Sequence, residues 1–282
     1  MIDYAHAALE GEKLLTAASV PDARTDARFL LEYVCGTDAS TIYREPGRSL
    51  SGEEKERYAG LLERRRKREP LQYITGRQYF YGLEFEVDSS VLVPRADTEV
   101  LVECVLEKSP EGRLLDLCTG SGCIPVSLLK KGKFTEAAAT DLSAEALRVA
   151  ERNAERHGLA ERLHFYEGDL FGALPEELKG SFDVLTSNPP YIESGVIPGL
   201  MPEVAVYEPH MALDGGGDGL VFYRRILEEA GEWLAPGGCI FLEIGCGQGA
   251  PVSALLEEKG FTEIRVRKDY ASLDRVVCGR RG

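Results

Sequence analysis

From Arg113 to its end, the chain alternates short apolar runs with segments of helical periodicity. This alternation is typical of a parallel sheet with helices on both faces, because each crossover between parallel strands needs a helix-length segment. We expect strands near 113–118, 136–140, 162–167, 182–187, 238–244, 261–267 and 274–279. We expect helices near 122–131, 143–156, 218–233 and 248–258, with Gly158 and Gly260 after two of them as C-cap glycines.

The connection between the last two predicted strands is too short for a helical crossover, so these strands should be antiparallel neighbours. An antiparallel last strand is more typical of methyltransferase sheets than of nucleotide-dehydrogenase sheets. Pro236-Gly237-Gly238 predicts a tight turn into the fifth strand. The predicted fold class is therefore α/β, a seven-stranded, doubly wound, Rossmann-like sheet.

The first 75 residues predict helices only, near 4–18, 22–35 and 52–67, the last with Ser51 as N-cap. We expect residues 1–75 to form a small helical domain that recognises a macromolecular partner. Residues 78–87 alternate around Gly82 and predict a β-hairpin within a linker at 76–92. The sheet domain then occupies 93–282, and its first helix, capped by Asp97 or Thr98, should run to about Lys108.

Composition narrows the possible partners. The net charge of -14 disfavours a direct nucleic-acid contact unless basic residues gather on one face. The run Arg64-Arg65-Arg66-Lys67-Arg68 either complements a helix dipole or docks a partner. No apolar stretch approaches the roughly 20 residues that span a bilayer, and Met1 to Tyr4 lack the pattern of a signal peptide.

The seven cysteines are odd in number, scattered and without a CxxC pair. This pattern predicts a reduced, cytoplasmic chain and no metal site.

The segment from Leu114 to Gly122 predicts a buried strand that enters a loop of small residues and opens a helix. Glycines allow close approach to a ligand, and helix N-terminal N–H groups lie at such a loop. The loop lacks GxGxxG spacing, and Asp116 would repel a pyrophosphate but suit an ammonium group. We therefore expect a ligand with a positive amino-acid end. The candidate contacts are Asp116, Cys118, Thr119, Gly120, Ser121 and Gly122.

Two further acids end predicted strands. Asp141 could accept hydrogen bonds from both hydroxyls of a ribose, or it could simply cap the helix after Ser143. Asp169 could accept from an adenine amino group with Leu170 beside the ring, although a plain turn explains the same residues.

Asn188-Pro189-Pro190-Tyr191 follows the fourth predicted strand. Two prolines enforce an extended, rigid turn. The Asn188 side-chain oxygen and the Pro189 carbonyl could accept both hydrogens of a planar NH2 group, and the Tyr191 ring could cover its flat face. The alternative is a proline-terminated strand with a hydrogen-bonded asparagine.

All four motifs follow strands whose carboxyl ends meet where the strand order reverses, which is the usual ligand site of open α/β sheets. An aminoacyl adenosine without phosphate beside an NH2-binding corner indicates S-adenosylmethionine and methyl transfer to nitrogen.

The chain resembles the HemK (PrmC) family of protein-(glutamine-N5) methyltransferases, which modify the Gly-Gly-Gln glutamine of class I peptide-chain release factors. The resemblance covers nearly all 282 residues and implies a class I S-adenosylmethionine-dependent methyltransferase fold with a small N-terminal helical bundle domain. Its motifs are Pro94-Arg95 to Thr98-Glu99, the glycine loop, Asn188 to Tyr191, and Tyr207-Glu208-Pro209 to Ala212-Leu213-Asp214-Gly215-Gly216. Asn-Pro-Pro-Tyr alone also occurs in adenine-N6 and ribosomal-RNA guanine methyltransferases.

By resemblance, S-adenosylmethionine binds Cys118 to Gly122, Asp141, Leu170 and Asn188, and the substrate glutamine binds Asn188 to Tyr191. The catalytic positions are Asn188, Pro189 and Tyr191. The resemblance implies a release factor as protein substrate, and the need for an open cofactor face suggests a monomer. Cys118 replaces an expected glycine, and Ala96 an expected proline.

Three rival functions remain open: a ribosomal-protein glutamine methyltransferase, a nucleic-acid amino methyltransferase, and a non-catalytic protein that binds S-adenosylmethionine. The acidic balance argues against the second, and the intact Asn188 to Tyr191 corner argues against the third.

Overall fold

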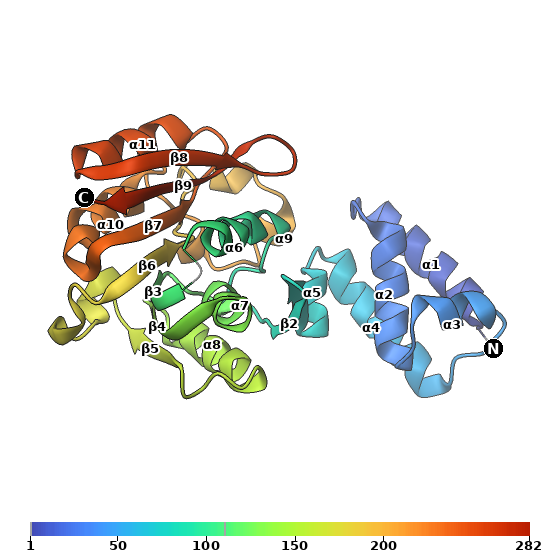
Figure 1. The fold of residues 1–282 in the computed structure, drawn as a ribbon. Helices are drawn as coiled ribbons and strands as arrows, with labels where there is room; N and C mark the ends of the chain where they lie inside the picture. Colours follow the sequence, from blue (N-terminus) through green and yellow to red (C-terminus); the bar gives the residue numbers. More distant parts are fainter. Residues whose placement is uncertain (1, 110) are drawn as a thin grey trace. The chain divides into compact units, whose positions relative to one another are not determined.

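The computed structural model describes residues 2–109 and 111–282, which form two compact units (Figure 1). The helical unit contains the chain up to Gly76 together with Met201–Tyr207, and the sheet unit contains Arg77–Leu200 and Glu208–Gly282. The sequence had placed Met201–Tyr207 in the sheet domain. The segment groups with the helical unit because Glu203 forms ion pairs with Arg65 and Arg68 there.

The helical unit contains the three predicted helices and three short ones that were not predicted. Its described helices are α1 (Tyr4–Ala17), α2 (Ala23–Cys35), α3 (Ala39–Arg44), α4 (Gly52–Arg66), α5 (Leu71–Thr75) and α9 (Pro202–Ala205). Ser51 caps α4, as predicted, and forms a reciprocal capping box with Glu54. In the core, the buried Tyr58 hydroxyl donates to the Ala7 and Ala27 carbonyls at 3.3 and 3.0 Å.

The basic run at the end of α4 is paired within this unit. Arg64 pairs with Glu69, Arg66 with Glu63, and Arg68 with Glu203. Arg65 is 5% exposed and bridges Asp26 at 2.7 Å and Glu203 at 2.9 Å. Local carboxylates therefore account for these arginines without a docked partner.

The sheet unit has the predicted class I methyltransferase topology. Its seven strands are β3 (Glu111–Leu117), β4 (Lys133–Asp141), β5 (Leu163–Glu167), β6 (Phe182–Ser187), β7 (Leu234–Glu243), β8 (Phe261–Lys268) and β9 (Asp274–Arg281). They lie in the order β5-β4-β3-β6-β7-β9-β8, and β9 is antiparallel to both of its neighbours. The order reverses between β3 and β6, where the ligand motifs were expected to meet.

Helices cover both faces of this sheet (Figure 1). One layer contains α6 (Ala96–Lys108), α7 (Cys123–Lys131) and α8 (Ala144–Arg156), and the other contains α10 (Val221–Trp233) and α11 (Gly249–Glu258). Successive strand residues enter opposite layers: Leu114 packs in the first core and Leu115 in the second. The central strands are therefore apolar on both faces, whereas the edge strand β8 is mostly exposed.

The predicted hairpin is formed by β1 (Arg77–Phe80) and β2 (Leu83–Glu86), paired antiparallel. The short 3-10 helices η1 (Leu170–Ala173), η2 (Glu176–Leu178), η3 (Ile197–Gly199) and η4 (His210–Ala212) lie in the connections.

Two local predictions were wrong. Pro236-Gly237-Gly238 lies within β7, where the pairing with β6 shifts register, so it forms an irregularity and not the turn before the strand. Helix α6 begins at Ala96 after Arg95, so Asp97 and Thr98 lie in its first turn and do not cap it.

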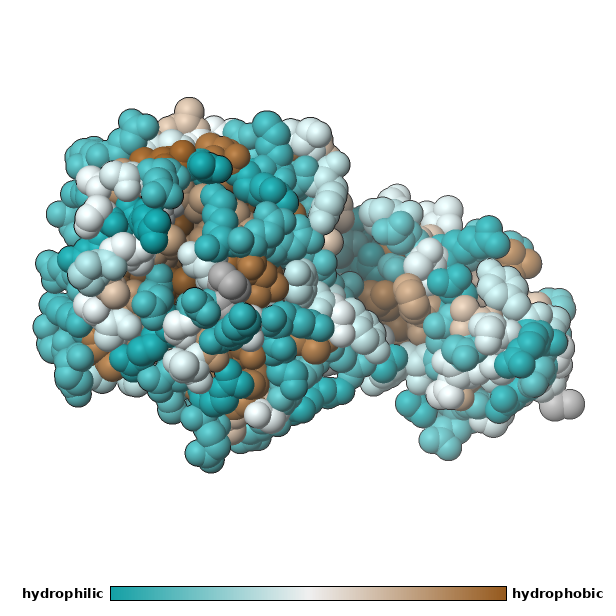
Figure 2. All heavy atoms as spheres, viewed as in Figure 1, coloured by the Kyte–Doolittle hydropathy of each residue, from teal (hydrophilic) through white to brown (hydrophobic). Residues whose placement is uncertain are grey.

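None of the helices in the described ranges is long and apolar enough to cross a membrane. The face shown in Figure 2 is mostly hydrophilic, with smaller hydrophobic areas between the polar residues.

Candidate active site

A cavity of about 440 Å³ lies in the sheet unit at the carboxyl ends of the strands. The predicted site residues that line it are Cys118, Thr119, Gly120, Ser121, Asp141, Asp169, Leu170, Asn188 and Pro190. Four predicted residues do not line it: Asp116, Gly122, Pro189 and Tyr191. The cavity is large enough for a nucleoside-sized ligand.

The loop after β3 is held in a left-handed backbone conformation. The φ angles of Cys118, Gly120 and Gly122 are 58°, 55° and 76°. A cysteine is strained at such an angle, which explains physically why glycine is the expected residue at position 118. Burial raises the pKa of the Cys118 thiol, so this thiol stays protonated at neutral pH.

Asp141 supports this loop directly. Its Oδ2 accepts the Gly120 N–H at 2.8 Å, and its Oδ1 accepts the Ser143 N–H at 3.0 Å. Burial raises its pKa, against the effect of these backbone N–H groups. The N-cap of α8 is Ser143, whose hydroxyl accepts from Ala146, so the helix-cap alternative for Asp141 is wrong.

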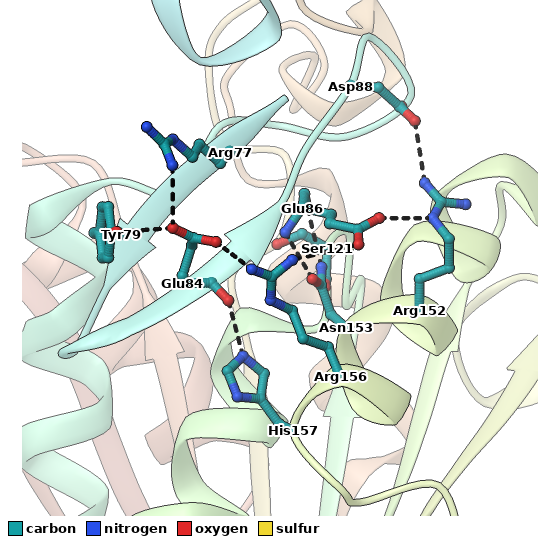
Figure 3. A network of polar contacts seen from close by, with 10 residues as sticks. All are labelled: Arg77, Tyr79, Glu84, Glu86, Asp88, Ser121, Arg152, Asn153, Arg156 and His157. Carbon is teal, nitrogen blue, oxygen red and sulfur yellow. Dashed lines mark hydrogen bonds and ion pairs between the residues drawn. The ribbon is translucent and has the colours of Figure 1, made fainter. Parts of the chain in front are cut away.

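Asn153 on α8 connects the loop to the hairpin (Figure 3). Its Nδ2 donates to the Ser121 carbonyl at 2.9 Å and to the Glu86 carbonyl at 3.0 Å, and its Oδ1 accepts the Glu86 N–H at 2.7 Å. The side chain is fully buried, so each of these bonds is shielded from water. Arg152 and Arg156 add ion pairs from α8 to β2 at the rim of this network.

Asp116 lies behind the loop and does not reach the cavity surface. Its Oδ1 accepts from the Thr186 hydroxyl at 2.6 Å, while its Oδ2 is buried without a hydrogen bond of good geometry among the described residues. Burial raises the pKa of Asp116 to about 7, against the favourable Thr186 and Thr119 hydroxyls. The loop is therefore backed by a carboxyl group that titrates near neutral pH.

The third acid lies at the cavity edge. Asp169 is paired with Arg225 at 2.7 Å through one carboxylate oxygen, and its other oxygen has no ion-pair partner among the described residues. Leu170 has a φ of 52° and is buried against the cavity. Thr140 also contributes to the cavity wall, but its hydroxyl is buried away from the cavity surface and has no hydrogen-bond partner among the described residues.

The Asn188 corner leaves the end of β6 as predicted. Pro189 and Pro190 are buried, and the Asn188 Nδ2 donates to the Thr98 Oγ1 at 3.3 Å. This bond leaves the Asn188 Oδ1 for a ligand in the cavity.

Tyr191 has a different position from the one expected. Its hydroxyl donates to the Glu243 Oε1 at 3.4 Å, and its ring does not line the cavity. The Gln248 side chain donates to the Tyr191 carbonyl at 3.1 Å and fixes this part of the turn. Burial raises the Tyr191 pKa, so the phenol stays protonated.

The structure adds residues to which sequence reasoning gave no role. The Arg95 Nη2 pairs with the buried Glu208 Oε2 at 2.5 Å, and the Glu208 Oε1 accepts the Val93 N–H at 3.2 Å. This contact joins two of the quoted motifs, Pro94-Arg95 and Glu208-Pro209, beside the cavity. The sequence contained both motifs, but only the fold shows that Arg95 and Glu208 form an ion pair.

Comparison with known proteins agrees with this geometry. The PrmC N-terminal domain family matches residues 6–76, and the methyltransferase small domain family matches residues 95–230. A methyltransferase structure from Pyrococcus furiosus superposes with a TM-score of 0.53 at 21% identity, covering 72% of this chain and 91% of that chain. This structural likeness supports the fold.

Curated relatives match almost end to end. A release factor glutamine methyltransferase from Geobacter sulfurreducens is 44% identical over 269 residues, covering 95% of this chain and 93% of the relative. One from Clostridium acetobutylicum is 42% identical over 260 residues, covering 91% of each chain. The chain belongs to the release factor glutamine methyltransferase family, whose PrmC N-terminal and methyltransferase domains it carries.

Proposed function

We propose that this protein methylates the side-chain amide nitrogen, N5, of the glutamine in the Gly-Gly-Gln motif of class I release factors. The observation that carries the proposal is Asn188, whose Nδ2 is bonded to Thr98 so that its Oδ1 is left for a substrate NH2 group at the cavity wall. The names of the end-to-end relatives support the same substrate.

The cavity fits S-adenosylmethionine, which supplies an electrophilic methyl group on a sulfonium sulfur. The backbone from Cys118 to Gly122 would lie against its amino-acid part, with the buried Asp116 charge behind. Asp141 would accept hydrogen bonds from the ribose hydroxyls. Asp169 and Leu170 would flank the adenine.

An amide nitrogen is a weak nucleophile because its lone pair is delocalised into the carbonyl. The Asn188 Oδ1, at the cavity wall, would accept one of its two hydrogens and aim the nitrogen at the methyl group. The Pro189 carbonyl is the proposed acceptor for the second hydrogen, although Pro189 does not line the cavity. When bound, S-adenosylmethionine would supply the methyl group and keep the electrons of its carbon–sulfur bond, and the methylated nitrogen would release one proton to water. The chain contributes position and electrostatics, and no strong base is required.

Tyr191 would contribute to methyl transfer by holding the Asn188 to Tyr191 turn in position. Its hydroxyl bond to Glu243 and its carbonyl bond to Gln248 hold the two prolines in place. The buried, protonated phenol is unsuited to take a proton from the substrate. We further propose that the protein acts as a cytoplasmic monomer and that the helical unit binds the release factor.

Transfer of radiolabelled methyl from S-adenosylmethionine to a purified release factor tests this function. Parallel samples would contain the release factor with its loop glutamine changed to alanine, a ribosomal protein fraction, and DNA. We expect label on the intact release factor alone. Label on the ribosomal fraction or DNA instead, with none on the release factor, would contradict the proposed substrate.

A further inference from the structure

The proposed role of Asn188 requires one orientation of its carboxamide. A carboxamide accepts hydrogen bonds through Oδ1 and donates them through Nδ2, so only Oδ1 can accept an N–H from a substrate. A hydroxyl such as that of Thr98 can both donate and accept. The 3.3 Å contact alone would therefore allow the amide to turn around and present its NH2 group to the cavity.

Glu243 removes this ambiguity. It ends β7, is 1% exposed, and accepts from the Tyr191 hydroxyl at 3.4 Å through Oε1. Its Oε2 is buried without a hydrogen bond of good geometry among the described residues, although the Thr98 hydroxyl is close enough to favour the charged carboxylate.

An ionised carboxylate only accepts hydrogen bonds. If the Thr98 hydroxyl turns so that its O–H donates to Glu243, the Thr98 oxygen is left to accept from the Asn188 Nδ2. The charged Glu243, at the buried end of this chain of hydrogen bonds, therefore determines which group donates and which accepts in each bond.

We propose that Thr98 and Glu243 are positioning residues for methyl transfer, which turn the Asn188 Oδ1 toward the substrate amide. The inference rests on the proposed function for the role of Asn188.

The ionisation of Glu243 depends on groups from several elements. Burial raises its pKa to about 7 and Asp97 on α6 adds to the rise, whereas Thr98, Arg275 on β9 and Tyr191 favour the charged form. Arg275 is shared, because its Nη2 lies 3.1 Å from both Asp97 and Asp269. The Tyr223 hydroxyl of α10 donates to the Glu243 backbone carbonyl at 2.8 Å and leaves the carboxylate to the other partners.

When Glu243 is protonated, its O–H can donate to the Thr98 oxygen. The Thr98 hydroxyl can then donate to Asn188, so the carboxamide is no longer held with its Oδ1 toward the substrate. Because the charged form is the active one, turnover should fall as the pH falls through about 7.

Steady-state kinetics with a release factor test the inference through Thr98→Val, which keeps the shape but removes the hydroxyl, and Thr98→Ser, which restores it. Thr135→Val, at an exposed position on β4, is the matched control. We expect Thr98→Val to lower kcat about 10- to 100-fold, with the KM for S-adenosylmethionine within about threefold, because only alignment is lost. Thr98→Ser and the control should stay within about threefold of the parent protein. A Thr98→Val protein with parental kcat would overturn the proposal.

Glu243→Gln separates polarity from packing, since a glutamine of the same shape can donate to Thr98. Asp116 also has a pKa of about 7, so kcat is measured at saturating S-adenosylmethionine, where a change in cofactor affinity cannot limit it. Under these conditions we expect kcat to fall and the acidic limb of the kcat profile to disappear between pH 6 and 8.5. Retention of that limb in Glu243→Gln would contradict the assignment to Glu243.

A measurement without protein substrate separates this inference from the proposed function. If the parent protein leaves the release factor unmethylated, the proposed function fails, and the side-chain 15N–1H resonance of Asn188 still reports on the network. That resonance, assigned with Asn188→Ala, should titrate near pH 7 in the parent protein and lose this titration in Thr98→Val. An Asn188 resonance indifferent to pH from 6 to 8.5 would refute the coupling.

Discussion

Replacing Asp116 with asparagine should stabilise the sheet unit in a pH-dependent way. The folded carboxyl has a pKa of about 7, against 3.8 for an ordinary aspartate. At about 1.4 kcal/mol per pKa unit, keeping this buried group ionised at pH 8 costs the folded state about 4 kcal/mol. The asparagine is neutral at every pH and can keep the Thr186 bond. It can also offer its NH2 group to the nearby Thr119 hydroxyl, which has no hydrogen bond of good geometry among the described residues.

The sign follows from proton linkage. A raised folded pKa means that the folded state holds the proton more tightly, so its stability falls as the pH rises from about 4 to about 7. Asp116→Asn should therefore exceed the parent protein in unfolding free energy by about 2 to 4 kcal/mol at pH 8. The difference should shrink to about 0.6 kcal/mol at pH 4, where the folded carboxyl is protonated and the unfolded one is only partly ionised.

Urea unfolding without cofactor measures this difference, followed by the fluorescence of Trp233, the single tryptophan, which is buried in the sheet unit. Glu177→Gln, at an exposed position in η2, is the control and should show no such pH trend. An Asp116→Asn protein with an equal difference at pH 4 and pH 8, or with none at pH 8, would refute the reasoning.

Asp116→Asn also tests whether the destabilising charge of Asp116 serves to bind the cofactor. If the Asp116 charge attracts the ammonium group of S-adenosylmethionine through the loop, its removal should weaken binding about tenfold or more in a calorimetric titration. Stabilisation with unchanged affinity would show that the charge has no part in binding the cofactor.

Three further outcomes follow from local contacts. Gly215→Ala should lower kcat at least about tenfold, because its Cβ would lie 2.7 Å from the Tyr191 Cα, whereas Gly217→Ala, with open space around it, should not. Glu203→Gln should lower the melting temperature of the helical unit and speed hydrogen exchange in Met201–Tyr207, because it weakens the ion pairs with Arg65 and Arg68. Hydrogen exchange equal to that of the parent protein would contradict this prediction. Iodoacetamide at pH 8 should label the exposed Cys246 well before Cys118, whose buried thiol has a raised pKa; peptide mass spectrometry that finds equal labelling would contradict that assignment.

The sequence predicted those parts of the fold that depend on long periodic segments. Helices such as Ala144–Arg156 and strands such as Phe182–Ser187 bury whole faces, and their patterns are unambiguous. Short helices such as Leu71–Thr75 contain too few residues to show a period. The position of Met201–Tyr207 depends on ion pairs with residues more than a hundred positions away, which no local pattern reveals.

For the site as well, some residues could be predicted from the sequence and others could not. Motifs at strand ends identified Asn188 and Asp141 because the topology brings strand ends together. Thr98 resembles a helix cap by local chemistry, and only the packing of α6 against the β6 turn makes it the partner of Asn188. Tyr191 was expected over the substrate, but the buried Glu243 draws its hydroxyl away from the cavity.

The most direct test of methyl transfer at this corner is the turnover of Asn188→Ala on a release factor, measured together with its affinity for S-adenosylmethionine. The proposed mechanism predicts that kcat falls by about 100- to 1000-fold, because the substrate amide loses both an acceptor and its alignment. The dissociation constant for the cofactor should change by no more than about fivefold, since the loop from Cys118 to Gly122 and Asp141 remain in place. A kcat within about tenfold of the parent protein would contradict the role assigned to Asn188.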